Sequence, residues 1–121
     1  MFVVFKCTAG GSDGWGNILR LRTIFEKLKE KKKFSYLFIV NNNLALKKYL
    51  KKNEIKFKSF NSFEKEKKFI KNYEIDITII ELLNCEKFIQ KFYKSLSKKL
   101  VILDDIAKKK YISDILIICQ K

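Results

Sequence analysis

All four glycines of this 121-residue chain lie within seven residues, and the chain has no proline. The four are Gly10, Gly11, Gly14 and Gly16. Glycine adopts backbone conformations that are costly for other residues, so we expect unusual turns in this segment alone. The segment follows an apolar run at 2–5 and precedes a helix-like stretch at 18–31. A glycine-rich connection between a first strand and a first helix is where α/β proteins bring backbone N–H groups to phosphate.

The rest of the chain alternates short apolar runs with amphipathic, lysine-rich stretches. In the first of these stretches, apolar residues recur every three or four positions, which predicts a helix with one apolar face. The apolar runs predict strands at 2–5, 35–40, 55–60, 76–82, 100–103 and 115–118. The stretches between them predict helices at 18–31, 44–52, 62–72 and 85–97, with Asn43 as a candidate N-cap of the second.

Strands separated by helices indicate βαβ units, and therefore a parallel sheet with helices on both faces. The runs at 2–5, 76–82 and 100–103 are continuously apolar, as in central strands, whereas 55–60 alternates, as in an edge strand. We therefore predict an α/β fold with a Rossmann-like sheet of five to six strands. The expected order is 3-2-1-4-5 with the last strand beyond it, in a single domain spanning 1–121.

The formal net charge is +14, which raises the question of an anionic partner. Among 27 basic residues only Arg20 and Arg22 are arginine, and the lysines are spread over most of the chain. This spread favours a generic solvated surface over a nucleic-acid footprint. A nucleic-acid-binding module remains an alternative, and it predicts an affinity that falls steeply with salt.

The chain offers few residues for metal or acid–base chemistry. The cysteines Cys7, Cys85 and Cys119 are far apart and fit no metal spacing, and histidine is absent. We expect neither a metal nor a cofactor. An odd cysteine count, no signal-peptide pattern and no membrane-length apolar run predict reduced thiols in a cytoplasmic protein without a transmembrane segment.

Ligands of such sheets bind at the carboxyl ends of the strands. There the sequence places the glycine segment and the candidates Glu81, Asn84, Asp104 and Asp105. Arg20, one turn into the first helix, is a candidate for a bidentate contact with phosphate or carboxylate. The glycine spacing fits neither the dinucleotide fingerprint nor the P-loop, so a plain turn with Trp15 as a packing residue remains an alternative.

The acidic candidates also have two interpretations. Asp104 and Asp105 either cap a buried strand end or act on sugar hydroxyls or protons. Glu81 lies late in an apolar strand and needs a cationic partner if it is buried; Arg20 and Lys109 are both candidates.

Three segments resemble one protein family. Gly14-Trp-Gly-Asn-Ile-Leu-Arg20, followed by Thr23, resembles the N-terminal signature of nucleotide-sugar hydrolases and glycosyltransferase-like proteins. This family includes the UDP-sugar hydrolase of pseudaminic acid biosynthesis and spore-coat polysaccharide biosynthesis proteins. The segments 101–106 and 113–118 resemble two later motifs of that family, in the same order.

The resemblance implies a sugar or UDP-sugar substrate and the N-terminal domain of a two-domain GT-B arrangement. It implies that a second, nucleotide-binding domain comes from elsewhere, as in a split glycosyltransferase completed by a partner chain, or that the chain is a fragment or a gene remnant. The family's catalytic histidine falls on Asn17, which cannot act as a base, so we expect weak activity or none from the chain alone. The substrate-binding residues implied are Gly10, Gly11, Gly14, Gly16, Arg20, Asp104 and Asp105.

Overall fold

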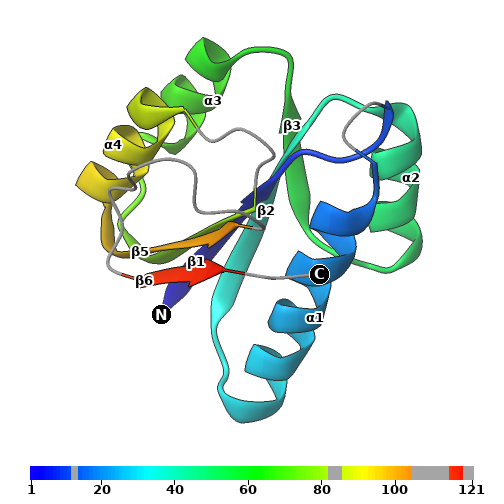
Figure 1. The fold of residues 1–121 in the computed structure, drawn as a ribbon, viewed down its shortest axis with the longest axis horizontal. Helices are drawn as coiled ribbons and strands as arrows, with labels where there is room; N and C mark the ends of the chain where they lie inside the picture. Colours follow the sequence, from blue (N-terminus) through cyan, green and yellow to red (C-terminus); the bar gives the residue numbers. More distant parts are fainter. Residues whose placement is uncertain (12–13, 82–85, 105–114, 119–121) are drawn as a thin grey trace.

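The computed structural model describes residues 1–11, 14–81, 86–104 and 115–118, without the side chains of 104 and 115–118. It has an α/β architecture in which six strands form one sheet (Figure 1). The strands are β1 (Phe2–Cys7), β2 (Ser35–Asn41), β3 (Phe57–Phe60), β4 (Ile75–Glu81), β5 (Ser97–Asp104) and β6 (Ile115–Ile118). The helices are α1 (Gly16–Lys31), α2 (Leu44–Lys52), α3 (Phe63–Ile70) and α4 (Lys87–Leu96).

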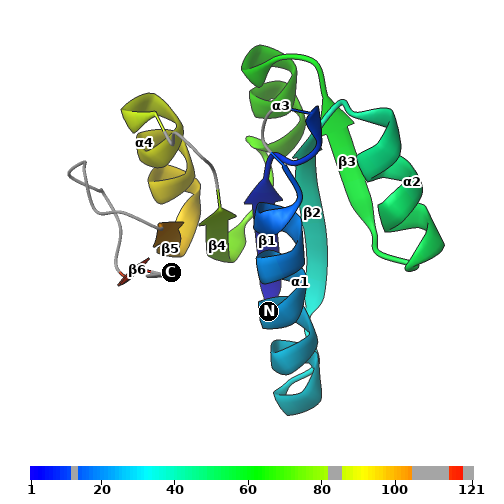
Figure 2. The same ribbon diagram turned by 45° about the vertical axis from the view of Figure 1, so that its right-hand side comes forward.

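The sheet is parallel throughout and has the order β3-β2-β1-β4-β5-β6. This confirms the predicted Rossmann-like fold, with the alternating strand β3 at one edge and the last strand beyond β5. Figure 2 shows β1 between β4 and β2. Val4 pairs with Leu37 on one side and Thr78 on the other, so β1 is hydrogen-bonded to a neighbouring strand on both sides.

Helices cover both faces of the sheet, as expected for parallel strands. Side chains of β1 alternate between the faces: Val3, Phe5 and Cys7 pack with α1 and α2, whereas Val4 packs with α3 and α4. The two apolar cores that result are separated by the sheet itself. Each helix needs only one apolar face, which is why the lysine-rich sequences between the strands can fold.

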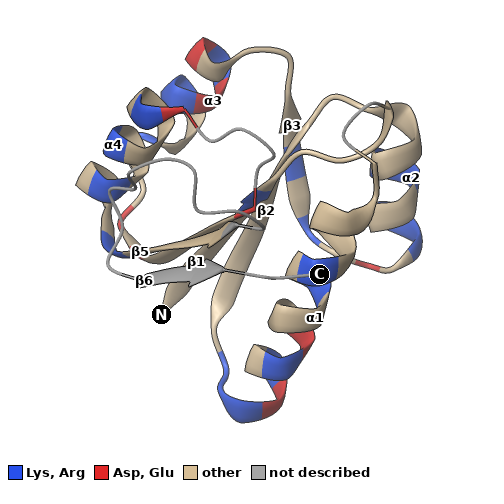
Figure 3. Cartoon of the chain, in the orientation of Figure 1, with Lys and Arg blue, Asp and Glu red and all other residues tan. Residues whose placement is uncertain are grey.

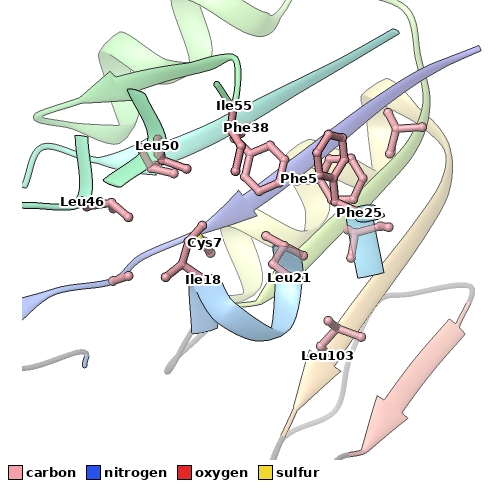
Figure 4. Close-up of a cluster of buried hydrophobic side chains, with 14 residues drawn as sticks. Phe5, Cys7, Ile18, Leu21, Phe25, Phe38, Leu46, Leu50, Ile55 and Leu103 are labelled. Atoms are coloured by element: carbon pink, nitrogen blue, oxygen red, sulfur yellow. The ribbon is translucent and has the colours of Figure 1, made fainter. Parts of the chain in front are cut away.

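An aromatic group forms the centre of the core under α1 (Figure 4). The Phe5 ring stacks on Phe38 with centroids 4.9 Å apart and meets Phe25 edge-on at 5.4 Å. All three side chains are buried. Strands β1 and β2 and helix α1 therefore meet at one aromatic contact, which adds to the apolar area that they bury together.

The ends of several elements differ from the predicted ones. Strand β1 continues two residues beyond the predicted end, because Lys6 and Cys7 still pair with both neighbouring strands. Helix α2 has the predicted bounds, and Asn43 caps it by accepting a hydrogen bond from the Leu46 N–H at 2.9 Å. Ser62 caps α3 in the same way.

Among the described residues, no helix has the length and apolar character needed to cross a membrane.

We expect the variant Phe5→Ala to lower the free energy of unfolding by about 3–5 kcal/mol, because it removes a buried ring from the contact with Phe25 and Phe38. Urea unfolding followed by circular dichroism measures this. Phe5→Leu keeps most of the apolar volume and should cost roughly 1–2 kcal/mol. Phe88→Ala, at an exposed ring, is the control and should cost under about 1 kcal/mol. Equal losses for the two alanine variants would contradict this picture of the core.

Candidate functional site

The carboxyl ends of β1, β2 and β4 lie at one end of the sheet, and the glycine segment leaves β1 there (Figure 2). Cys7, the last residue of β1, pairs with Glu81, the last residue of β4. Asn41 ends β2 on the other side of β1. The structure therefore brings together most of the predicted site residues that it describes.

The glycine segment forms a tight loop. Gly10, Gly11 and Gly14 have positive φ angles of 84°, 56° and 69°, a conformation that favours glycine. The Gly10 N–H donates to the carbonyl of Gly14 at 2.6 Å, so the loop folds back on itself. Gly16 differs, because it begins α1 and its φ is not positive.

Two asparagines after β2 hold this loop. The Asn41 carboxamide accepts a hydrogen bond from the Ala9 N–H at 3.0 Å and donates one to the Ala9 carbonyl at 3.1 Å. Asn43 lies so close to Gly10 that a Cβ at position 10 would be 2.7 Å from its Nδ2. A side chain at position 10 would therefore clash, in addition to being strained by the backbone conformation.

Asn17, at the position of the family histidine, is buried and has a structural contact. Its Nδ2 donates to the Thr8 carbonyl at 3.1 Å and so ties the first turn of α1 to the end of β1. Thr23, which also matched the family pattern, is exposed and donates to the Leu19 carbonyl of its own helix. Neither contact requires a ligand.

Arg20 and Glu81 form an ion pair beside the loop. Arg20 Nη1 lies 3.5 Å from Glu81 Oε1, and the two side chains are 24% and 3% exposed. Of the two partners considered for Glu81, the structure therefore pairs it with Arg20, whereas Lys109 lies outside the described residues. The Arg20 side chain is partly exposed, and guanidinium groups are suited to contacts with phosphate or carboxylate.

Cys7 is buried beneath the loop and does not serve as a nucleophile. Burial raises the pKa of its thiol to about 12, and the nearby Lys6 lowers it only in part. Because the thiolate is the reactive form, this cysteine is inert at neutral pH. Its role is packing against α1.

The remaining candidates lie at or beyond the limits of the described residues. Asp104 is the last residue of β5, where it pairs with Ile118 of β6. Its backbone therefore lies at the same end of the sheet as Glu81, and its strand β5 is the second strand from β1. Asp105 and Asn84 fall outside the described residues.

Sequence reasoning missed a second polar cluster, on the face covered by α3 and α4. Lys6 Nζ lies 2.8 Å and 2.7 Å from the two carboxylate oxygens of Glu66, and the Tyr93 hydroxyl donates to Glu66 at 2.5 Å. All three side chains are buried. Burial raises the pKa of Tyr93, and the Glu66 charge adds to this rise, so the phenol keeps its proton.

A sequence signal for this cluster existed but depended on the strand boundary. Lys6 lies between the apolar residues Phe5 and Cys7, and a charged side chain inside a central strand needs a buried partner. The predicted strand ended at residue 5 and did not include Lys6. Within the described ranges, the structure shows no group of three or more metal-ligating side chains.

Comparison of the chain with models of protein families, with curated proteins and with solved structures found no match.

We expect Lys6→Met and Glu66→Gln each to lower the free energy of unfolding by about 3 kcal/mol, because each leaves a buried polar group without its charged partner. The double variant Lys6→Met/Glu66→Gln should lose less than the sum, with a coupling of about 1–3 kcal/mol in a denaturation cycle.

The ion pair between Lys67 and Glu64, 3.3 Å apart on the surface of α3, is the matched control. Its coupling should stay below about 1 kcal/mol, because solvent screens exposed charges. Equal couplings for the two pairs would show that burial of the Lys6–Glu66 pair has no energetic consequence.

Proposed function

We propose that a sugar or UDP-sugar binds at the carboxyl ends of β1 and β4. The glycine loop and the start of α1 would surround its anionic group. The first turn of α1 contains no acidic residue, and no side chain of the described residues caps it. Backbone N–H groups at such a helix start, together with the helix dipole, favour an anion. This helix start lies directly after the glycine loop.

The observation that carries the proposal is the ion pair between Arg20 and Glu81 beside this helix start. A guanidinium binds phosphate through paired hydrogen bonds, and the buried Glu81 carboxylate holds the Arg20 side chain beside the helix start. The two groups come from α1 and β4 and lie where the start of α1 meets the carboxyl end of β4. Arg20 is 24% exposed and Glu81 only 3%, so an anionic group of the ligand would contact Arg20.

In this proposal Gly10, Gly11, Gly14 and Gly16 shape the binding loop, Asn17 and Arg20 contact the ligand, and Asp104 and Asp105 orient it. We expect the chain to bind its ligand but to turn it over weakly or not at all. Asn17 has no basic group for activating water, and loss of a general base typically costs about 10²–10⁴-fold in rate. The proposed reaction class, hydrolysis or glycosyl transfer, rests on the resemblance to nucleotide-sugar hydrolases and glycosyltransferases.

We expect the chain to bind UDP and UDP-amino-sugars in calorimetric titrations and to release little or no UDP on incubation. Arg20→Gln should weaken binding about tenfold, because it removes a charge-assisted contact. Arg22→Gln is the matched control: Arg22 donates to the Tyr49 hydroxyl at 2.9 Å and should not affect the affinity.

Thermal unfolding of both variants separates loss of binding from loss of folding. Absence of UDP binding to the folded parent chain would refute the proposed ligand class. Rapid UDP release by the isolated chain would refute the expectation of weak activity.

A second candidate function is that of a subunit completed by a nucleotide-binding partner. Trp15, Leu19 and Leu44 are 37%, 51% and 66% exposed. They belong to the starts of α1 and α2, at the same edge of the sheet as the glycine loop. Exposed apolar side chains at this edge are suited to a protein contact.

This candidate predicts that UDP-sugar turnover appears only when the chain is mixed with its partner. Leu19→Ser/Leu44→Ser should abolish that turnover without unfolding the chain, because both side chains are exposed. Tyr73→Ser, also at an exposed position but outside this edge, is the control. Unchanged turnover with the double serine variant would exclude this surface as the contact.

The distribution of lysine does not single out a nucleic-acid interface. Figure 3 shows Lys and Arg on all four helices and on β3. The described basic residues thus lie over both faces of the sheet instead of along one stripe. Binding of RNA or DNA that persists at physiological salt would support a nucleic-acid-binding function.

A further inference from the structure

We propose that Asn41 is a positioning residue that holds the glycine loop in its binding conformation and closes the β2 side of the site. The inference rests on the proposed function, because it assigns the ligand to the β1–β4 side of the loop. Asn41 matches no motif, and it lies just beyond the strand predicted at 35–40.

Asn41 continues the pairing of β1 and β2 beyond the point where their backbones separate. The last backbone pair between these strands joins Cys7 to Val40. The Asn41 backbone pairs instead with Phe60 of β3, while its side chain turns toward Ala9. Both hydrogen-bonding groups of Ala9 are thereby satisfied by one carboxamide, as a neighbouring strand would satisfy them.

Only a carboxamide of this length suits the position. The contact needs one donor and one acceptor, at 3.1 Å and 3.0 Å from Ala9. A carboxylate can accept from the Ala9 N–H but cannot donate to its carbonyl. Ala9 is fully buried, so loss of both partners would leave two backbone groups without hydrogen bonds in an apolar core.

The same turn also lies against the next residue of the loop, Gly10. The Asn43 N–H donates to the Asn41 carbonyl at 3.0 Å, and the Asn43 side chain both caps α2 and lies against Gly10. Two residues of one turn thus lie against two successive loop residues: Asn41 is hydrogen-bonded to Ala9, and Asn43 lies next to Gly10. The positive φ of Gly10 follows directly after the fixed Ala9 peptide.

This arrangement has a consequence for ligand choice. In dinucleotide sites an acidic residue about 20 positions after the glycine loop bonds to the ribose hydroxyl. At the end of β2, the carboxamide of Asn41 is engaged with the protein backbone. Asn41 is therefore not available for the ribose contact, and the proposed ligand contact lies on the other side of the loop, at Arg20. A ligand that needs contacts from both sides, such as NAD, should not bind.

The test compares Asn41→Ala with Asn42→Ala in the full chain. Asn42 is the adjacent, exposed residue, and its side chain bonds to Asn61 and Lys47 instead of the loop. In the ligand-free protein, amide hydrogen exchange at Ala9 should accelerate about tenfold or more in Asn41→Ala only, because its acceptor is lost. Asn41→Asp retains an acceptor and should show a smaller effect at Ala9.

The second measurement is affinity for UDP, which should fall about tenfold in Asn41→Ala and stay unchanged in Asn42→Ala. NAD should bind to neither variant nor to the parent chain. If Asn41→Ala fails to fold, Asn41→Asp carries both measurements.

The outcomes separate the two proposals. Equal Ala9 exchange in Asn41→Ala, Asn42→Ala and the parent chain would overturn the role of Asn41 in holding the loop. Faster exchange with unchanged UDP affinity would overturn its role in binding. If the parent chain binds no UDP but Asn41→Ala still accelerates exchange at Ala9, the proposed function is wrong. The role of Asn41 in holding the loop is then still supported.

Discussion

The structure depends on the burial of β1 on both faces and along both edges. Hydrogen bonds to β2 and β4 use its backbone, while α1 and α2 cover one face and α3 and α4 the other. Every side chain from Val3 to Cys7 is buried. A strand in this position can contain a charged residue only if the charge is neutralised, and Lys6 meets this condition through Glu66.

The same constraint explains why the polar groups gather at one edge. Parallel strands end together, so the residues after β1, β2 and β4 meet where the backbone leaves the sheet. There the loop must turn sharply, and its buried backbone groups must still find partners. Glycines provide the turn, and Asn41 and Asn17 provide hydrogen bonds to Ala9 and Thr8. The proposed ligand site is the remaining side of this loop, near Arg20 and Glu81.

Two carboxylates illustrate how burial determines the partners. Glu81 and Glu66 are both buried, one on each face of the sheet, and each is paired with a cation. The pair of Glu81 involves Arg20, which is partly exposed and is the residue proposed to contact the ligand. The pair of Glu66 is enclosed and bonded to Tyr93, so its effect is on the packing of α3 and α4 against β1.

The sequence alone determined the element order, the parallel sheet, the central and edge strands and the place of the glycine loop. These follow from local patterns, because apolar periodicity and glycine content act within a few residues. It also predicted the Asn43 cap and offered Arg20 as one of two partners for Glu81. Only the tertiary structure decided that Asn41 binds the Ala9 backbone, that Asn17 bonds to Thr8 and that Lys6 pairs with Glu66. Those contacts join residues 9 to 60 positions apart, and their geometry exists only after the strands have paired and the helices have packed.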